Sequence, residues 1–298
     1  MKRHSLWFVL LVISVLIVLA GCSTNTGAKT NKNSEVTIQL GLSPQEDSVE
    51  ILRQYKAFKE YMEGRTGYNF ELFVGADYTA VVEAINSGNL DVAWFGPSEY
   101  LLAKEITEAD IEAFAQATQE EGASPYQSWV IVNSKSKIQT VEDLKGKTFA
   151  FTDPASTSGY IFGNYKLIQE GFDPKKDFGK IAYSGSHDAS ALSVANGTID
   201  GATVSSRLLE GFYESGLVKE KDIRVVTKSM EIPNDLMAYR SNLPEDVKQK
   251  LRDAINDSEG IKKALAGTGY GAFKEVNDSD YDIVREAFKL AGVEPSFE

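Results

Sequence analysis

Short strand patterns alternate with amphipathic helix patterns along most of this chain, and the alternation begins again after Pro125. Residues 36–40 alternate apolar and polar side chains, which is typical of a strand. Strands and helices that alternate over short connections predict an α/β fold, in which helices flank a largely parallel sheet. In the first unit we expect strands at 36–40, 70–74, 91–95 and 111–117, helices at 49–62 and 78–86, and a short helix around Tyr100 and Leu101.

The helix at 49–62 is expected to end at Gly64 and Gly67. Its predicted buried face consists of Val49, Leu52, Tyr55, Phe58, Tyr61 and Met62.

A second α/β unit follows, and the chain is expected to end in helices only. The second series comprises strands at 129–132, 147–151, 180–183, 199–204, 224–227 and 236–239, and helices at 158–170 and 189–196. From Pro244 onward we expect helices at 245–256, 258–266 and 280–291, packed on the first lobe because a lone helical tail cannot bury its own apolar faces. We therefore predict two lobes, one formed by 36–125 with 233–298 and the other by 126–232.

The N-terminal segment has the pattern of an export signal. Two basic residues, Lys2 and Arg3, precede an apolar run from Leu6 to Ala20, which is shorter than the roughly 20 residues of a permanent membrane helix. The run ends in Leu-Ala-Gly-Cys22, which matches a bacterial lipobox. We therefore expect residues 1–22 to form a lipoprotein signal peptide, with Cys22 acylated and anchored to the cell membrane.

The next residues, 23–35, are nearly all small or polar and are predicted to be a flexible tether. Cys22 is the only cysteine in the chain, so neither a disulfide nor a cysteine-based metal site is available.

Charge and composition argue against several classes of function. The formal net charge is -12, whereas a nucleic-acid-binding protein needs a basic surface. The sequence offers few candidate catalytic residues, because His4 lies in the signal and His187 is the only histidine of the body. A Ser-x-x-Lys sequence at 134–137 lies between a strand and a helix start and is interpreted as a solvated loop. We expect no enzyme activity, cofactor or metal.

One segment has the features of an anion site. Residues 152–160 connect a strand to a helix, and Ser156, Thr157 and Ser158 fall at the helix start. Backbone N–H groups there have no intrahelical partner, and the helix dipole favours negative charge. Three hydroxyl groups add donors suited to tetrahedral oxygens, so an anion can bind without a fixed cation. A plain helix cap is the alternative, since one hydroxyl suffices for that.

Three further residues are candidates on position alone. Tyr78 begins a helix, His187 lies in a strand-to-helix loop, and Asp235 precedes a strand. Each also has an ordinary interpretation: a core aromatic, a solvated histidine and a turn residue, respectively.

Several motifs occur in a family-like order: Asp77–Tyr78, Asp91–Gly96, Ser156–Gly159, His187–Asp188 and Ile232–Asp235. In this combination the chain resembles the phosphonate/phosphite/phosphate-binding proteins of ABC importers, the PhnD-like family, over essentially its whole mature length. The resemblance implies a two-lobed, type II periplasmic-binding fold that closes on a ligand between the lobes, without catalysis. It also implies that the phosphoryl group contacts Ser156, Thr157 and Ser158, with Tyr78, Tyr126, His187 and Asp235 completing the site.

One departure from the family bears on the ligand. Members selective for aminoalkyl phosphonates offer a carboxylate to the ligand's ammonium, where this chain has Arg207 beside Ser205 and Ser206. An arginine repels an ammonium group, although Glu210 lies one helical turn later. We therefore expect phosphite, phosphate or a small alkylphosphonate, with Ser206 and Arg207 as candidate selectivity residues for the ligand's tail.

The expected mechanism is hinge closure driven by the contacts that the second lobe adds. Asp235 is expected to accept a hydrogen bond from a P–OH group, which sulfate lacks, and His187 is expected to be protonated beside the anion. The expected partners are an ABC permease and the membrane, with the protein itself monomeric. A same-fold receptor for another oxyanion or sulfonate, a receptor that serves a sensor kinase, and a secreted hydrolase stay open as alternatives.

Overall fold

Two mixed β-sheets organise the protein, and the computed structural model describes residues 36–106, 109–123 and 125–292. The six-stranded sheet of the first lobe has the order β11-β4-β10-β3-β1-β2. Its strands are β1 (Thr37–Leu42), β2 (Asn69–Val74), β3 (Val92–Phe95), β4 (Ile111–Gln119), β10 (Leu236–Arg240) and β11 (Tyr270–Lys274).

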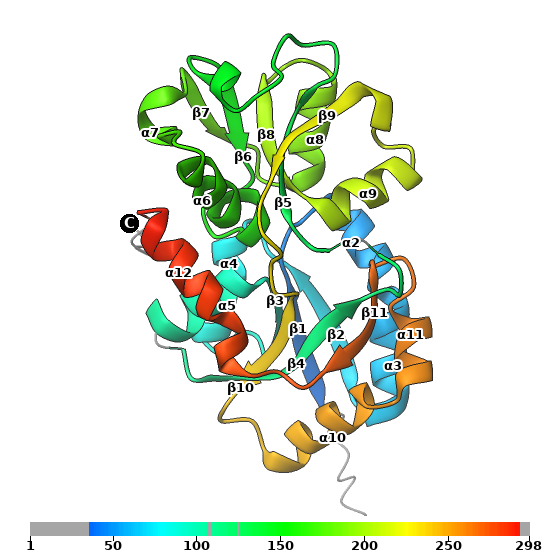
Figure 1. Ribbon diagram of the computed structural model, residues 1–298. Helices are drawn as coiled ribbons and strands as arrows, with labels where there is room; N and C mark the ends of the chain where they lie inside the picture. The colour runs from blue at the N-terminus through cyan, green and yellow to red at the C-terminus, as the bar shows by residue number, and fades with distance from the viewer. Residues whose placement is uncertain (1–35, 107–108, 124, 293–298) are drawn as a thin grey trace, which may run out of the picture. The chain divides into compact units, whose positions relative to one another are not determined.

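The five-stranded sheet of the second lobe has the order β7-β6-β8-β5-β9. Its strands are β5 (Ser128–Asn133), β6 (Thr148–Phe151), β7 (Lys180–Tyr183), β8 (Gly201–Ser205) and β9 (Ile223–Lys228). The α/β, two-lobed fold is confirmed (Figure 1). The sheets are mixed rather than largely parallel, because β10 is antiparallel to β3 and β4, and β5 is antiparallel to β8 and β9.

Helices connect the strands of both sheets (Figure 1). Their bounds are α2 (Ser48–Gln54), α3 (Lys56–Thr66), α4 (Tyr78–Asn86), α5 (Pro97–Leu101), α6 (Phe162–Gln169), α7 (Pro174–Asp177), α8 (His187–Ala195), α9 (Ser206–Glu214), α10 (Glu245–Ile255), α11 (Ser258–Ala264) and α12 (Asp282–Leu290). A π-helical segment, Thr157–Ile161, leads into α6, and a second one, Leu102–Ile106, follows α5. Among the described residues, none of the helices is long and apolar enough to cross a membrane.

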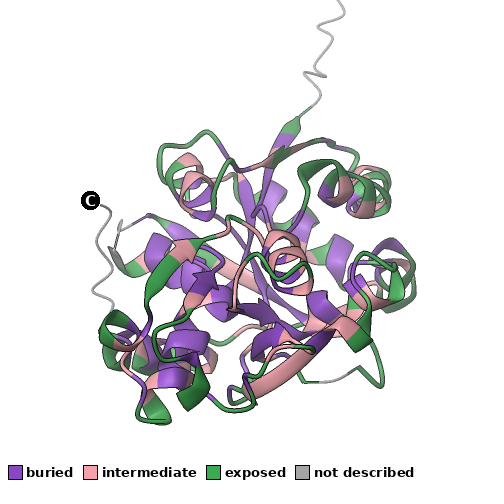
Figure 2. Cartoon of the chain, turned by 90° about the horizontal axis from the view of Figure 1, so that it is seen from above, coloured by how far each residue is buried: buried purple, intermediate pink, exposed green. Residues whose placement is uncertain are grey.

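The strands are buried centrally, and exposed residues concentrate on outer helices and loops (Figure 2). In the first lobe, Trp94 of β3 packs edge-on against Tyr55 and Phe58, with ring centroids 5.2 and 5.5 Å apart. Each such aromatic pair contributes about 0.5–1.5 kcal/mol beyond the area that it buries. Trp94 is next to the last residue of β3, so these contacts fix the sheet beneath the loops at its carboxyl end.

The predicted helix at 49–62 is two helices, and the start of its predicted buried face was wrong. Tyr55 ends α2 and begins α3, and α3 continues through Gly64 to a left-handed cap at Gly67. Val49 is 75 % exposed, whereas Ile51, Tyr55, Phe58 and Met62 are buried. In the first turn, helical spacing is consistent with a buried face that contains either Val49 or Ile51. Tertiary packing decides which of the two is buried.

The prediction that only helices follow Pro244 was also wrong. Tyr270–Lys274 forms β11, which pairs antiparallel with β4 at an edge of the first sheet. Two glycines with positive φ, Gly267 and Gly269, turn the chain into this strand. The strand itself is short and contains Gly271, so its alternation is too brief to recognise.

Helix α12 contacts the second lobe as well as the first, on which the tail was expected to pack. It lies beside α5 and α6 (Figure 1). Its residues Val284, Ala287 and Phe288 share one apolar cluster with Phe162 and Tyr165 of α6. The Asn164 side chain also donates to the carbonyl of Ala291, at 3.3 Å.

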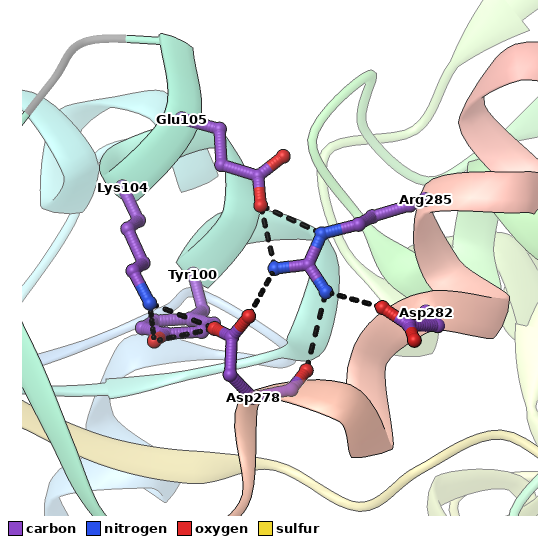
Figure 3. Close-up of polar contacts among 6 residues, drawn as sticks. All are labelled: Tyr100, Lys104, Glu105, Asp278, Asp282 and Arg285. Carbon is purple, nitrogen blue, oxygen red and sulfur yellow. Dashed lines mark hydrogen bonds and ion pairs between the residues drawn. The ribbon is translucent and has the colours of Figure 1, made fainter.

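Arg285 attaches α12 to the first lobe through a group of charges (Figure 3). It donates to Glu105 at 2.7 Å and to Asp278 and Asp282 at 2.8 Å, while Lys104 contacts Asp278 at 2.7 Å. The Arg285 side chain is 22 % exposed, so solvent screens these contacts only in part.

Replacing Arg285 by methionine is expected to lower the free energy of unfolding by about 1 kcal/mol, because several charge-assisted bonds are lost together. Thermal unfolding should show a Tm lower by about 2–4 °C. Lys263→Met is the control, since Lys263 and Glu259 form an i,i+4 pair with side chains 76 % and 83 % exposed. Equal effects from the two variants would contradict a special role for Arg285.

Candidate functional site

A small polar cavity lies where loops of the two lobes meet, and it is lined by side chains from segments far apart in the sequence. Its volume is about 10 Å³, on a scale where one water needs roughly 10–15 Å³. All seven residues proposed for the ligand, and Arg207, line it. The lining residues are Gln45, Tyr78, Gly96, Glu99, Tyr126, Ser156, Thr157, Ser158, His187, Ser205, Arg207, Leu208 and Asp235.

The segment after β6 presents Ser156–Ser158 to this cavity. Ser156 has extended backbone and caps the π-helical turn, its hydroxyl accepting the N–H of Gly159 at 3.1 Å. Residue 159 must be glycine, because a Cβ there would lie 2.3 Å from the Cβ of Thr152. The Thr152 N–H also donates to the Gly159 carbonyl at 2.9 Å, which holds this turn against the end of β6.

Each of the three hydroxyl oxygens already accepts a hydrogen bond from the protein. Ser156 accepts from Gly159, Thr157 accepts the N–H of Ser98 at 3.0 Å, and Ser158 accepts from Tyr126 at 3.1 Å. A hydroxyl that accepts one bond still has its own hydrogen to donate. The three hydroxyls are therefore poised as donors, and the Thr157 bond also joins the second lobe to α5 of the first.

His187 is neutral in the protein alone, whereas the expectation from sequence concerned a ring protonated beside a bound anion. Its Nδ1 lies 3.1 Å from the backbone N–H of Ser205, which can only donate, so Nδ1 carries no hydrogen. Burial, and then the charge of Arg207, lower the pKa of His187 to about 3. The neutral ring carries its hydrogen on Nε2, which makes His187 a donor without charge.

Two tyrosines close the cavity from opposite lobes. Tyr78 begins α4, where Asp77 caps the helix by accepting the N–H of Ala80 at 2.7 Å. The buried hydroxyl of Tyr78 makes no well-formed hydrogen bond with the described residues; burial raises its pKa well above the ordinary value, and the nearby Ser156 hydroxyl opposes this. Such an unpaired group is costly unless something polar meets it. The Tyr126 hydroxyl instead donates to Ser158.

Asp235 and Arg207 form the charged side of the cavity. Asp235 is 2 % exposed, and its Oδ2 accepts from the Tyr270 hydroxyl at 2.6 Å and from Gln45 Nε2 at 3.2 Å. Arg207 Nη2 lies 3.8 Å from the same oxygen. Arg207 also donates to the Thr268 carbonyl at 2.8 Å and to Gln45 Oε1 at 2.9 Å.

Ser206, proposed as a selectivity residue, does not line the cavity. Its hydroxyl accepts the N–H of Gln127 at 2.9 Å and donates to the Pro125 carbonyl at 3.1 Å. It thereby fixes the segment by which the chain enters the second lobe. Cys22, with the signal and tether predicted at 1–22 and 23–35, lies outside the described residues.

Comparison with known proteins identifies the family. Residues 40–281 match the family described as ABC transporter, phosphonate, periplasmic substrate-binding protein. The chain belongs to this family.

Its relatives include the phosphonates-binding periplasmic protein of Escherichia coli, 29 % identical over 86 % of this chain and 77 % of that protein. The phosphate-import protein PhnD of Mycolicibacterium smegmatis is 29 % identical and covered at 94 % in both chains. A binding component of an ABC phosphonate transporter from Pseudomonas aeruginosa superposes with a TM-score of 0.80 at 30 % identity, covering 89 % of this chain and 90 % of that one. Members of the family are thus substrate-binding components of transporters.

Sequence reasoning missed two polar residues of the cavity in this family member. Gln45 follows β1 and bridges Arg207 and Asp235, and its carbonyl accepts the N–H of His187 at 2.9 Å. Glu99 on α5 is buried at the seam, which is the boundary between the two lobes where Thr157 contacts Ser98. The position of Gln45, at the carboxyl end of a central strand, was a usable signal. Glu99 has the pattern of an ordinary charge in the first turn of a helix.

Proposed function

We propose that this protein is the extracytoplasmic receptor of an ABC importer and binds phosphite, phosphate or a small phosphonate by closure of its lobes. The observation that carries the proposal is the convergence of donors from both lobes on one small cavity. Tyr78 comes from the first lobe, and Ser156, Thr157, Ser158 and His187 come from the second.

The donors suit a tetrahedral oxyanion. Three hydroxyl hydrogens and the neutral His187 offer bonds to oxygen without bringing a counter-charge, as in other anion sites built on helix starts. Asp235 is an acceptor in the wall of the same cavity. A hydrogen phosphonate or hydrogen phosphate has one P–OH group to give to that acceptor, which completes the match.

Asp235→Asn is expected to reduce the preference for methylphosphonate over sulfate by about tenfold or more, because the repulsive acceptor for a fully ionised anion is removed. Calorimetric titration of both anions into both proteins measures the change. An unchanged ratio of the two affinities would count against the assigned role.

The tail of the ligand is expected to be small and without a positive charge. Arg207 lines the cavity and aligns with the position at which the resemblance implies a carboxylate for an ammonium group, and its guanidinium is held by Thr268 and Gln45. Methylphosphonate, phosphite and phosphate fit these conditions better than aminoalkyl phosphonates.

Thermal shift with methylphosphonate, phosphite, phosphate, taurine and sulfate tests the function, since a ligand at about 100 times its Kd stabilises by about 2.7 kcal/mol. Stabilisation by a phosphorus anion supports the proposal. Stabilisation by taurine or sulfate alone would favour a same-fold receptor for sulfonates or another oxyanion, and turnover of a phosphate ester would favour a secreted hydrolase.

The proposal extends to the parts beyond the cavity. We assign 36–125 with 233–298 to one lobe and 126–232 to the other, and we propose a monomer anchored by lipidated Cys22 that delivers its ligand to the permease. No catalysis, cofactor, metal or nucleic acid enters this scheme. Release of the Cys22→Ala protein from the membrane fraction tests the anchor.

A further inference from the structure

A carboxyl group with no assigned role, Glu99, lies in the wall of the cavity. It is 1 % exposed, on the first turn of α5. Its Oε2 accepts the backbone N–H of Gly96 at 2.9 Å, and its Oε1 is in a short hydrogen bond with the Ser43 hydroxyl. Thr157, which lines the cavity, accepts the N–H of Ser98, the residue before Glu99. Glu99 is therefore part of the seam that forms when the lobes meet.

The surroundings of Glu99 disfavour a negative charge. Among the residues that the structure describes, no lysine, arginine or histidine forms an ion pair with it. Burial raises its pKa well above the ordinary value, the bonds from Ser43 and Gly96 oppose this, and the carboxylates of Asp235 and Asp153 raise it further. A buried carboxyl group without a cation becomes neutral rather than bearing the cost of desolvation.

Titratable groups approach Glu99 from several elements. They are Tyr78 on α4, Tyr126 before β5, Asp153 after β6 and Asp235 before β10, with His187 and Arg207 farther along the cavity wall. Arg207 and Asp235 carry opposite charges 3.8 Å apart, and His187 is neutral. Asp153 does not line the cavity, so among the lining residues the charge state of Glu99 decides whether the net charge is zero or one negative.

We propose that Glu99 is a protonated carboxylic acid of the binding cavity, which keeps the cavity able to accept an anion, and that loss of its proton weakens binding. The inference rests on the proposed function. In the protonated state Oε1 donates to the Ser43 oxygen, the reverse of the bond in which the Ser43 hydroxyl donates to an ionised carboxylate, while Oε2 accepts from Gly96. Ligand and ionised Glu99 then compete, so the bound anion itself holds the proton on the carboxyl group.

Glu99→Gln reproduces the protonated geometry, because an amide oxygen can accept from Gly96 and an amide N–H can donate to Ser43. We expect the variant to bind methylphosphonate within about threefold of the native chain at about pH 6. Above the pKa of Glu99, the native affinity divided by that of the variant should fall by about tenfold for each pH unit. The ionisation of methylphosphonate changes both affinities equally with pH and therefore cancels in this ratio. Phosphite serves as a second probe.

Infrared spectroscopy of the full chain gives an independent readout. At about pH 6 we expect a carbonyl stretching band of a protonated carboxyl group that Glu99→Gln lacks. A flat affinity ratio with a persistent band supports the neutral state and places its pKa above the range studied. A variant about tenfold weaker at pH 6, or the absence of the band, overturns the inference. If neither anion binds the native chain, the proposed function fails, yet the band still decides the state of Glu99.

Discussion

Thr157→Val is expected to weaken methylphosphonate binding by about a hundredfold, which corresponds to about 2.7 kcal/mol. The Thr157 hydroxyl accepts the N–H of Ser98 from the other lobe and, in the proposed complex, donates to the anion. Valine keeps the volume but leaves the buried N–H unpaired, at a cost of about 1–3 kcal/mol, and removes a bond to a charged ligand. Both losses fall on the closed, ligand-bound form.

Thr198→Val is the matched control, since Thr198 is exposed in the loop before β8. It should leave the affinity unchanged in calorimetric titrations. A Thr157→Val protein that binds methylphosphonate as tightly as the native chain would remove this hydroxyl from the site. The thermal stability of the two variants shows whether any loss comes from misfolding.

Gly96→Ala is expected to reduce affinity by about a hundredfold or more, through a steric block at the seam. A Cβ at this position would lie 2.9 Å from Thr157 Oγ1, 3.1 Å from Glu99 Oε2 and 3.9 Å from Asp235 Oδ1. The first two distances are shorter than ordinary contacts, and Thr157 belongs to the opposite lobe. The added methyl group therefore obstructs the approach of Thr157, and the Glu99 side chain of its own lobe must also shift.

The control is Gly211→Ala in α9, where a Cβ meets nothing within 4 Å. That change should stabilise the protein by up to about 1 kcal/mol, because alanine is the better helix former. Small-angle scattering with saturating methylphosphonate measures closure directly. A Gly96→Ala protein that compacts on ligand addition as the native one does would refute the steric argument.

Much of the fold was predictable because local signals and tertiary structure agree. Helix α4 begins and ends as predicted, since Asp77 caps it and Val81, Val82 and Ile85 recur at helical spacing. The three-residue apolar stripe is buried against β1 and α5. Strand β7 was also predicted at its observed bounds, Lys180–Tyr183, where turn signals flank it on both sides.

The co-location of the candidate site residues was predictable for a related reason. Ser156–Ser158 and His187 follow strands of the second lobe, and loops at the carboxyl ends of parallel strands share one edge of a sheet. Their role toward a ligand stays a prediction. Glu99 was not predictable, because a glutamate in the first turn of a helix is normally a solvated charge that complements the helix dipole. Its burial follows from tertiary packing of α5 against elements of the first lobe and the turn at Thr157–Ile161 of the second.

The charge of His187 could not be predicted from sequence, since it depends on a hydrogen bond between residues 18 positions apart. The backbone N–H of Ser205 occupies the lone pair of Nδ1 when β8 lies beside the start of α8. An argument from the ligand's charge alone points the other way. In the protein alone the Ser205 N–H keeps Nδ1 without a hydrogen, because a buried N–H without an acceptor would be costly.

Because α12 contacts both lobes, the lobes are expected to separate less easily on its side of the seam than on the other. On its side, parting the lobes would expose apolar surface shared by Phe288 and Phe162. On the opposite side, the lobes meet through polar contacts such as Asp47 N–H to Asp188 at 3.1 Å, for which water can substitute. The rotation axis of opening is therefore expected to run close to α12, which acts as the hinge between the lobes. Solute is then expected to enter from the Asp47 side.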